Sequence, residues 1–161
     1  MVADLARRET ARIRELTVEI NRLERNIEQR AAVLVPSLVQ IPGCGALTAG
    51  KLIGEAADIT RFKSRDAYAK WAGVAPIPFW SANNTRFCLN RGGNRQTNAA
   101  LHRIAITQMR MHPDAQAFIK RRIETGSTKR EAIRLLKRKL ANFVYQTLLQ
   151  DTQTIPLAQA A

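Results

Sequence analysis

The chain has 161 residues, of which 45% are hydrophobic, enough for one domain with a packed core. Lys and Arg number 26 against 13 Asp and Glu, which gives a net charge of +13. Residues 1–35 hold seven basic and six acidic residues, whereas residues 36–161 hold nineteen and seven. We therefore expect the second part to bind a polyanion, most simply DNA or RNA, the alternative being a solubilising surface.

The same composition excludes several classes of protein. The two cysteines, Cys44 and Cys88, stand alone without a Cys/His cluster, so structural zinc is not expected. Two isolated thiols fit the cytosol. The charged N-terminus lacks the apolar segment of a signal peptide, and the apolar runs are too short to span a membrane.

Residues 3–34 are predicted to form one long coiled-coil helix that precedes a compact, mainly α domain. Arg30 interrupts one d position of a heptad pattern whose apolar a and d residues are Ile13, Leu16, Ile20, Leu23, Ile27 and Leu34. Ile at a with Leu at d favours two strands, but Glu19 and Glu24 would face each other in a parallel pair. Three alternatives stay open: an antiparallel coil, a helix that packs against another part of the protein, and an ordinary amphipathic helix. With a coil, we expect self-association as a dimer or higher oligomer.

Residues 36–57 follow the pattern of a helix-hairpin-helix motif. Pro36 ends the long helix, and a short apolar turn leads into the sequence IPGCG and a second helix. The glycines permit a tight hairpin with positive φ, and backbone N–H groups at the start of the second helix point outwards at a phosphate. The predicted phosphate contacts are Gly43, Cys44, Gly45 and Lys51. The alternative is a helix corner without a ligand.

Residues 74–95 are predicted to form a long loop around a single serine, Ser81. Before it, Ser64 caps a short helix that ends near Ala72. Loops of this length in a compact domain are usually functional, and aromatic residues flank the serine. We expect a short strand over residues 85–89. The groups predicted to hold an anion are Arg86, Arg91, Asn94 and Arg95.

Three helices are predicted between residues 94 and 149, the last beginning at the capping box Thr128–Glu131. The inner face of the last helix is expected to consist of Ile133, Leu136, Leu140, Phe143 and Thr147. Its basic stripe, predicted to contact nucleic acid rather than only solvent, consists of Arg130, Arg134, Lys137 and Arg138. His102, on the first of the three helices, is a candidate base or phosphate ligand, with helix packing as the alternative. Residues 151–161 are expected to form a frayed tail.

Residues 36–150 resemble the C-terminal domain of insertion-sequence transposases of the 110/116/902 type. The resemblance rests on ordered blocks: IPGCGALTAGKLIGE, WAGVAPIP, a serine, LNRGGNRQTNAALHRIA and EAIRLLKRKLANFVY. The helix at 3–34 resembles the coiled coil that precedes this domain in the family. The resemblance implies that the chain is the DNA-binding and strand-cleaving part of an RNA-guided bacterial transposase. It also implies DNA and a guide RNA as partners, and a location in the cytoplasm at the nucleoid.

The resemblance also implies that Ser81 attacks a DNA phosphodiester and forms a phosphoserine link. A serine hydroxyl is a weak nucleophile, and the developing charge on the phosphate needs donors, for which Arg86, Arg91 and Arg95 are candidates. In the family, magnesium is held by acids of a separate N-terminal domain. The thirteen acids here are scattered, so we expect no metal site in this chain and no strand transfer by it alone.

Two departures from the family pattern fall beside the serine. Ala82 stands where the family usually has glycine, and Phe87 and Cys88 replace a basic pair. Both favour a decayed copy, because they restrict the serine loop and weaken the phosphate cradle. The alternatives to the transposase reading are a non-catalytic helix-hairpin-helix module and a truncated remnant whose coil alone is active.

Overall fold

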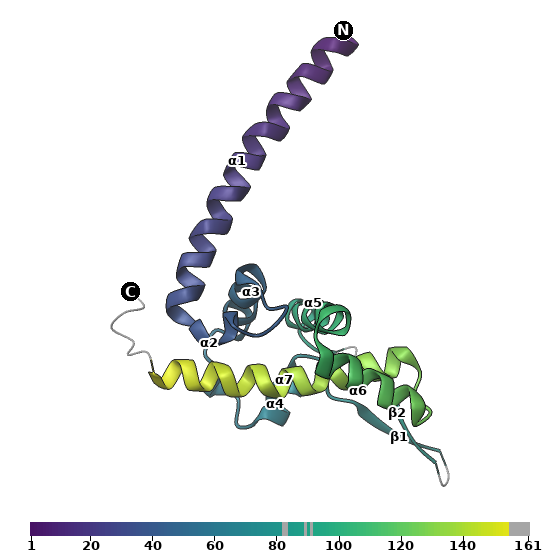
Figure 1. The fold of residues 1–161 in the computed structure, drawn as a ribbon. Helices are drawn as coiled ribbons and strands as arrows, with labels where there is room; N and C mark the ends of the chain where they lie inside the picture. Colours follow the sequence, from purple (N-terminus) through teal and green to yellow (C-terminus); the bar gives the residue numbers. More distant parts are fainter. Residues whose placement is uncertain (82–83, 89, 91, 155–161) are drawn as a thin grey trace.

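The computed structural model describes residues 1–81, 84–88, 90 and 92–154, with backbone alone for residues 78–81 and 84–88. Over these ranges the chain is mainly α, as expected, with one antiparallel β hairpin (Figure 1). The helices are α1 (Val2–Leu34), α2 (Pro36–Val39), α3 (Ala46–Ala56), the 3-10 helix η1 (Ile59–Arg61), α4 (Arg65–Trp71), α5 (Arg95–Met111), α6 (Pro113–Glu124) and α7 (Lys129–Thr154). The strands are β1 (Ile77–Ser81) and β2 (Asn84–Cys88). Within this part of the chain, no helix is long and apolar enough to cross a membrane.

Local signals in the sequence set the ends of the helices. The Ser64 hydroxyl accepts a hydrogen bond from the Ala67 N–H at 3.2 Å and so caps α4, as predicted. At the start of α7, the Thr128 N–H donates to Glu131 Oε2 at 2.8 Å and the Glu131 N–H donates to Thr128 Oγ1 at 3.3 Å. This confirms the predicted capping box. α7 continues to Thr154, so the first four residues assigned to the tail are helical, and residues 155–161 lie outside the described range.

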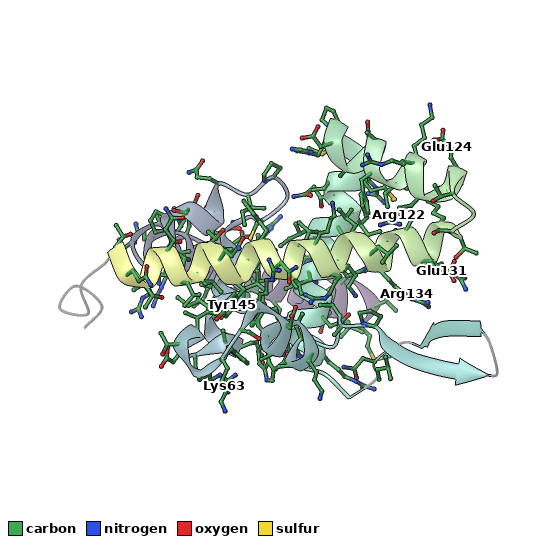
Figure 2. The ribbon with its side chains drawn as sticks, turned by 90° about the horizontal axis from the view of Figure 1, so that it is seen from below. Lys63, Arg122, Glu124, Glu131, Arg134 and Tyr145 are labelled. Carbon is green, nitrogen blue, oxygen red and sulfur yellow. The ribbon has the colours of Figure 1, made fainter. Side chains whose placement is uncertain are left out.

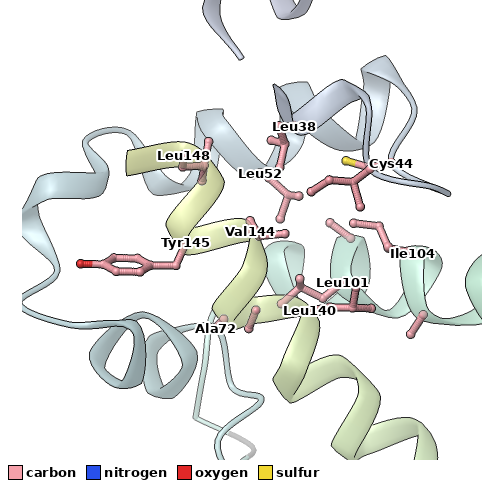
Figure 3. Close-up of a cluster of buried hydrophobic side chains, with 14 of the residues drawn as sticks. Leu38, Cys44, Leu52, Ala72, Leu101, Ile104, Leu140, Val144, Tyr145 and Leu148 are labelled. Carbon is pink, nitrogen blue, oxygen red and sulfur yellow. The ribbon is translucent and has the colours of Figure 1, made fainter. Parts of the chain in front are cut away.

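Helix α7 is the centre of the fold, because it contacts α2, α4, α5, α6 and η1. Figure 3 shows Leu52 of α3, Leu101 of α5 and Val144 of α7 in the buried cluster, and all three are fully buried. Burying such a side chain stabilises the fold by about 1.5–3 kcal/mol. The predicted inner face of α7 is wrong at Phe143, which is 53% exposed, because the packed side of the helix instead carries Val144, in the buried cluster, and Tyr145, which packs on Tyr68 of α4.

Helix α1 projects from this core and contacts it only near its own C-terminal end (Figure 1). It packs on α3, where Ile27 Cγ2 lies 2.9 Å from the place a Cβ would take at Gly50. Only Ala31 of α1 is buried, whereas Ile13 and Ile20 are 63% and 58% exposed. Most of the apolar heptad positions are therefore left uncovered by the described part of the chain.

The segment predicted as an irregular loop is largely a β hairpin. Residues 77–81 pair antiparallel with residues 84–88, so the expected strand has a partner that the sequence did not reveal, and Ser81 pairs with Asn84. The hairpin projects away from the helices (Figure 1). Its base is fixed where the Asn94 N–H donates to the Trp71 carbonyl at 2.7 Å.

Candidate nucleic-acid interface

Four of the predicted phosphate ligands meet in one groove between α5 and α7. The groove has a volume of about 670 Å³, and its walls and floor are formed by Asn90, Gly93, Arg95, Asn98, Ala99, His102, Arg130, Ile133, Arg134 and Lys137. Both helices contribute residues at spacings of three and four, the period at which side chains share one face of a helix. Figure 2 shows Arg134 on the side of α7 toward the β hairpin, with Arg122 on the opposite side of the helix in this view.

Lys137 is the most buried of the charged residues in the groove. It is 9% exposed, and its Nζ donates to Asn98 Oδ1 at 2.5 Å. Burial, and then the neighbouring Arg134 guanidinium, lower the pKa of Lys137 below its usual value. Lys137 belongs to the predicted basic stripe, and its burial disagrees with the alternative of a solvated face for this residue.

His102 lies on α5 in the same groove as Lys137. Partial burial, and then the Lys137 ammonium, lower the pKa of His102 below its usual value of 6.5. The ten residues that line the groove include no Asp or Glu. The groove is therefore a concentration of positive charge that an anion would neutralise.

Asn98 connects the groove to the base of the hairpin. Its Nδ2 donates to the carbonyl oxygens of Ala72 at 3.1 Å and Gly73 at 3.0 Å, at the end of α4. Its side-chain oxygen is thereby left facing Lys137. The sequence reasoning missed Asn98 and also Asn90, whose Nδ2 donates to the Lys70 carbonyl at 3.2 Å. The signal was present as repeated asparagines in the block NRGGNRQTN.

Two other predicted ligands have structural partners. The Asn94 side-chain oxygen caps α5 by accepting from the Thr97 N–H at 2.8 Å, and its Nδ2 donates to Glu55 Oε2 at 2.7 Å. Arg138 forms an ion pair with Asp66 and donates to Asn142. Neither of these side chains lines the groove, and each is held by a neighbour in the fold.

The predicted helix-hairpin-helix segment lies on another part of α5. Gln108 Nε2 donates to the Pro42 carbonyl at 2.8 Å, which holds the hairpin against the C-terminal half of α5. Gly43 has the expected positive φ of 82°, whereas Gly45 has an ordinary extended backbone with φ of −68°. The prediction of positive φ at both glycines is therefore wrong at Gly45. The first helix of the motif, α2, is a single turn of four residues.

Not every backbone group predicted to bind phosphate in this hairpin is available to a ligand. The Cys44 N–H donates to the Ile41 carbonyl at 2.8 Å, so it is already paired within the turn. The Cys44 thiol is buried, and burial raises its pKa to about 12. Lys51 is half-buried on α3 and does not line the groove between α5 and α7.

The residues around the predicted nucleophile are described only in part. Ser81 is the last residue of β1, and Arg86, Phe87 and Cys88 belong to β2, with backbone alone described for all four. Ala82 and Arg91 lie outside the described residues. Within residues 1–81, 84–88, 90 and 92–154, no group of three His, Cys, Asp or Glu side chains is placed to hold a metal ion.

Comparison with known proteins identifies the family behind this arrangement. Residues 36–120 match the family described as "Transposase IS116/IS110/IS902 family". The chain belongs to this transposase family. The matched segment contains α3, the β hairpin with Ser81 and all of α5, so one wall of the basic groove lies inside it and the α7 wall lies beyond it.

Curated relatives of this transposase-family chain are much longer than it is. An uncharacterised 43.6 kDa protein of insertion element IS110 from Streptomyces coelicolor is 30% identical over 140 residues, covering 86% of this chain and 33% of that protein. Pilin gene-inverting proteins of Moraxella bovis and Moraxella lacunata are each 30% identical over 117 residues, covering 71% of this chain and 36% of theirs. The chain thus spans about a third of the length of these relatives.

Proposed function

We propose that the chain is the DNA-binding and strand-cleaving part of a transposase or recombinase, in which Ser81 forms the covalent link to DNA. One observation supports it above the others: a transposase-family chain carries a basic groove at the base of the hairpin that bears the predicted nucleophile. Phosphate contacts of this kind position a nucleic acid without reading its sequence. The net charge of +13 supports the same partner.

In the proposed reaction, the Ser81 hydroxyl oxygen attacks a phosphodiester phosphorus. A serine–phosphorus bond forms and the bond to one deoxyribose oxygen breaks; the serine proton goes to a base and the leaving oxygen gains a proton. The step is a transesterification, so the energy of the phosphodiester is kept for rejoining. Arg86 and Arg91 are the proposed donors to the negative charge that develops on the phosphate, whereas Arg95, which lines the groove between α5 and α7, is proposed to bind the DNA backbone.

The reaction also requires groups beyond this chain's described residues. Magnesium is expected for the complete transposase, but the carboxylates described here do not form a site that fits it. We therefore propose that another domain of the complete transposase supplies its ligands. A guide RNA is the proposed second partner, and the uncovered face of α1 is the proposed site of self-association. The setting proposed is the bacterial cytoplasm, on chromosomal DNA.

The proposal is tested by trapping the covalent intermediate. The chain is incubated with labelled element-end DNA, guide RNA, magnesium and, in trans, the metal-binding domain of a family member, and adducts are resolved on a denaturing gel. We expect an adduct with the unaltered chain and at least a 100-fold loss with Ser81→Ala, since no other group replaces the nucleophile. Ser37→Ala, on the exposed turn α2, is the matched control and keeps the adduct.

The outcomes separate the proposal from its alternative. An adduct that persists in Ser81→Ala contradicts the assignment of the nucleophile. DNA binding that is salt-dependent, with no adduct under any of these conditions, favours the non-catalytic nucleic-acid-binding module or a decayed copy of the transposase. DNA binding that does not weaken with salt contradicts both.

A further inference from the structure

We propose that the groove between α5 and α7 holds one backbone phosphate of the nucleic acid, with Lys137 as its buried ligand, and that this phosphate is not the one attacked by Ser81. The proposal rests on the proposed function, because it assumes a nucleic-acid partner. It adds a discrete site to that function, where the sequence indicated only a basic surface.

The first argument is the state of the Lys137 ammonium. It is nine-tenths buried, yet among the described residues it donates only to a neutral amide oxygen, Asn98 Oδ1. In the described part of the chain it has no carboxylate within salt-bridge distance. A buried ammonium without a negative partner is costly, and a phosphate in the groove supplies that partner.

The second argument is that the Lys137 side chain is held in place by its surroundings. Asn98 donates to two backbone carbonyl oxygens, so its own oxygen is fixed and orients the Lys137 amine. The surrounding cations, Arg95 and Arg134, lie on the two walls of the same groove. Ligands that are already oriented lose less entropy on binding than free surface lysines do. The groove is therefore built for one anion at a fixed position.

The third argument is the separation of this groove from the predicted nucleophile. The groove adjoins the base of the hairpin, where Asn98 contacts Gly73 and where Gly93 lies against Gly73. β1 runs from Ile77 to Ser81 and the hairpin projects away from the helices (Figure 1). At about 3.3 Å per residue, β1 alone spans about 13 Å, which corresponds to about four nucleotide steps of B-form DNA. A phosphate in the groove thus positions the strand at a distance from the attacked bond.

The proposal is tested by comparing Lys137→Met with Lys139→Met in the full chain. Each substitution removes one positive charge from α7, but Lys139 lies over the Phe118 ring, on the side of α7 that faces α6, with Nζ 4.6 Å from the ring centroid. The probe is a fluorescently labelled 20-base-pair DNA duplex, followed by anisotropy at several salt concentrations. We expect Lys137→Met to weaken binding about tenfold and to lower the salt slope by about one, and Lys139→Met to weaken it less than about twofold.

Circular dichroism melting controls for folding, and we expect Lys137→Met to melt no lower than the unaltered chain, because methionine matches the lysine stem in a buried site. Equal weakening by both substitutions overturns the discrete site in favour of a diffuse basic surface. An unaltered chain that fails to bind the duplex at low salt overturns the proposed function itself. In the adduct assay at subsaturating DNA, we expect Lys137→Met to lower the yield by about the tenfold loss of binding and no more, since a positioning contact acts through affinity. A loss as large as that of Ser81→Ala would instead place the attacked phosphate in the groove.

Discussion

At the scale of single residues, the positive charges in the groove alter one another. The Lys137 ammonium donates a hydrogen bond to Asn98, and Arg134 and His102 line the same groove. Burial is the main reason why the pKa values of Lys137 and His102 lie below their usual values, and the neighbouring cation lowers each pKa further because it raises the cost of a second positive charge. A bound phosphate reverses this effect, because it favours the charged form of each group.

This reversal predicts a pH dependence of DNA binding that arises at His102. In the free chain the lowered pKa keeps the imidazole neutral at pH 7, whereas a nearby phosphate raises that pKa, so binding takes up a proton. Affinity for the DNA duplex should therefore increase as the pH falls from 7.5 to 5.5. The measurement is the dissociation constant at each pH, at fixed ionic strength.

His102→Asn is the control, because it keeps a polar side chain that cannot gain a charge in this range. We expect its affinity to change about threefold less than that of the unaltered chain over the same pH interval. If the two pH profiles coincide, another group takes up the proton and His102 is not a phosphate ligand.

At the scale of elements, two glycines determine how the β hairpin joins the helices. A Cβ at Gly93 would lie 2.2 Å from Gly73 Cα and 2.2 Å from Gly73 N, both of them backbone atoms. Gly73 also has a positive φ of 69°, a conformation that side chains disfavour. The close contact between these two backbones lets the two ends of the hairpin meet beside the groove.

Gly93→Ala is predicted to destabilise the fold by about 1–3 kcal/mol, because the backbone has to move to admit the methyl group. The matched control is Gly54→Ala, within α3, where a Cβ would meet nothing within 4 Å. That substitution should stabilise the fold by about 0.5–1 kcal/mol, since alanine loses less entropy in a helix. Urea unfolding measures both. Equal effects of the two substitutions would show that Gly73 and Gly93 do not need their close contact.

At the scale of the whole molecule, the chain has a compact helical body and an uncovered helix. α1 has 33 residues, of which Ala31 alone is buried, and it leaves large apolar side chains in solvent. Leu16, Ile20 and Leu23 are 47%, 58% and 50% exposed and lie on a single heptad stripe. An apolar stripe of this kind is typical of a surface that pairs with another helix.

We predict that the chain self-associates through this stripe and that Ile20→Ser with Leu23→Ser together make it monomeric. The reason is that each serine removes an apolar contact from the centre of the helix pair. Val18→Ser is the control, because Val18 is 68% exposed but occupies heptad position f, away from the stripe. Light scattering coupled to size-exclusion chromatography measures the mass. An unaltered chain that is monomeric at about 100 μM, well above the range of ordinary coiled-coil dimers, contradicts the prediction.

The sequence by itself determined where most of the helices begin and end. Ser64, Asn94, the Thr128–Glu131 pair and the prolines each act on backbone groups within about four residues, so their effects could be read from local spacing. The same holds for the charge asymmetry and for the motif blocks, which pointed to a transposase family that the comparison then confirmed.

Only the tertiary structure decided which residues face one another. The inner face predicted for α7 included Phe143, but the packing of other segments around that helix buries Val144 and Tyr145 instead. The burial of Lys137 and its contact with Asn98 depend on segments that lie 39 residues apart in the chain. The spacing of residues along a helix indicates which of them lie on the same face. Whether that face is buried depends on the other segments that cover it. The groove could therefore be recognised only in the folded chain.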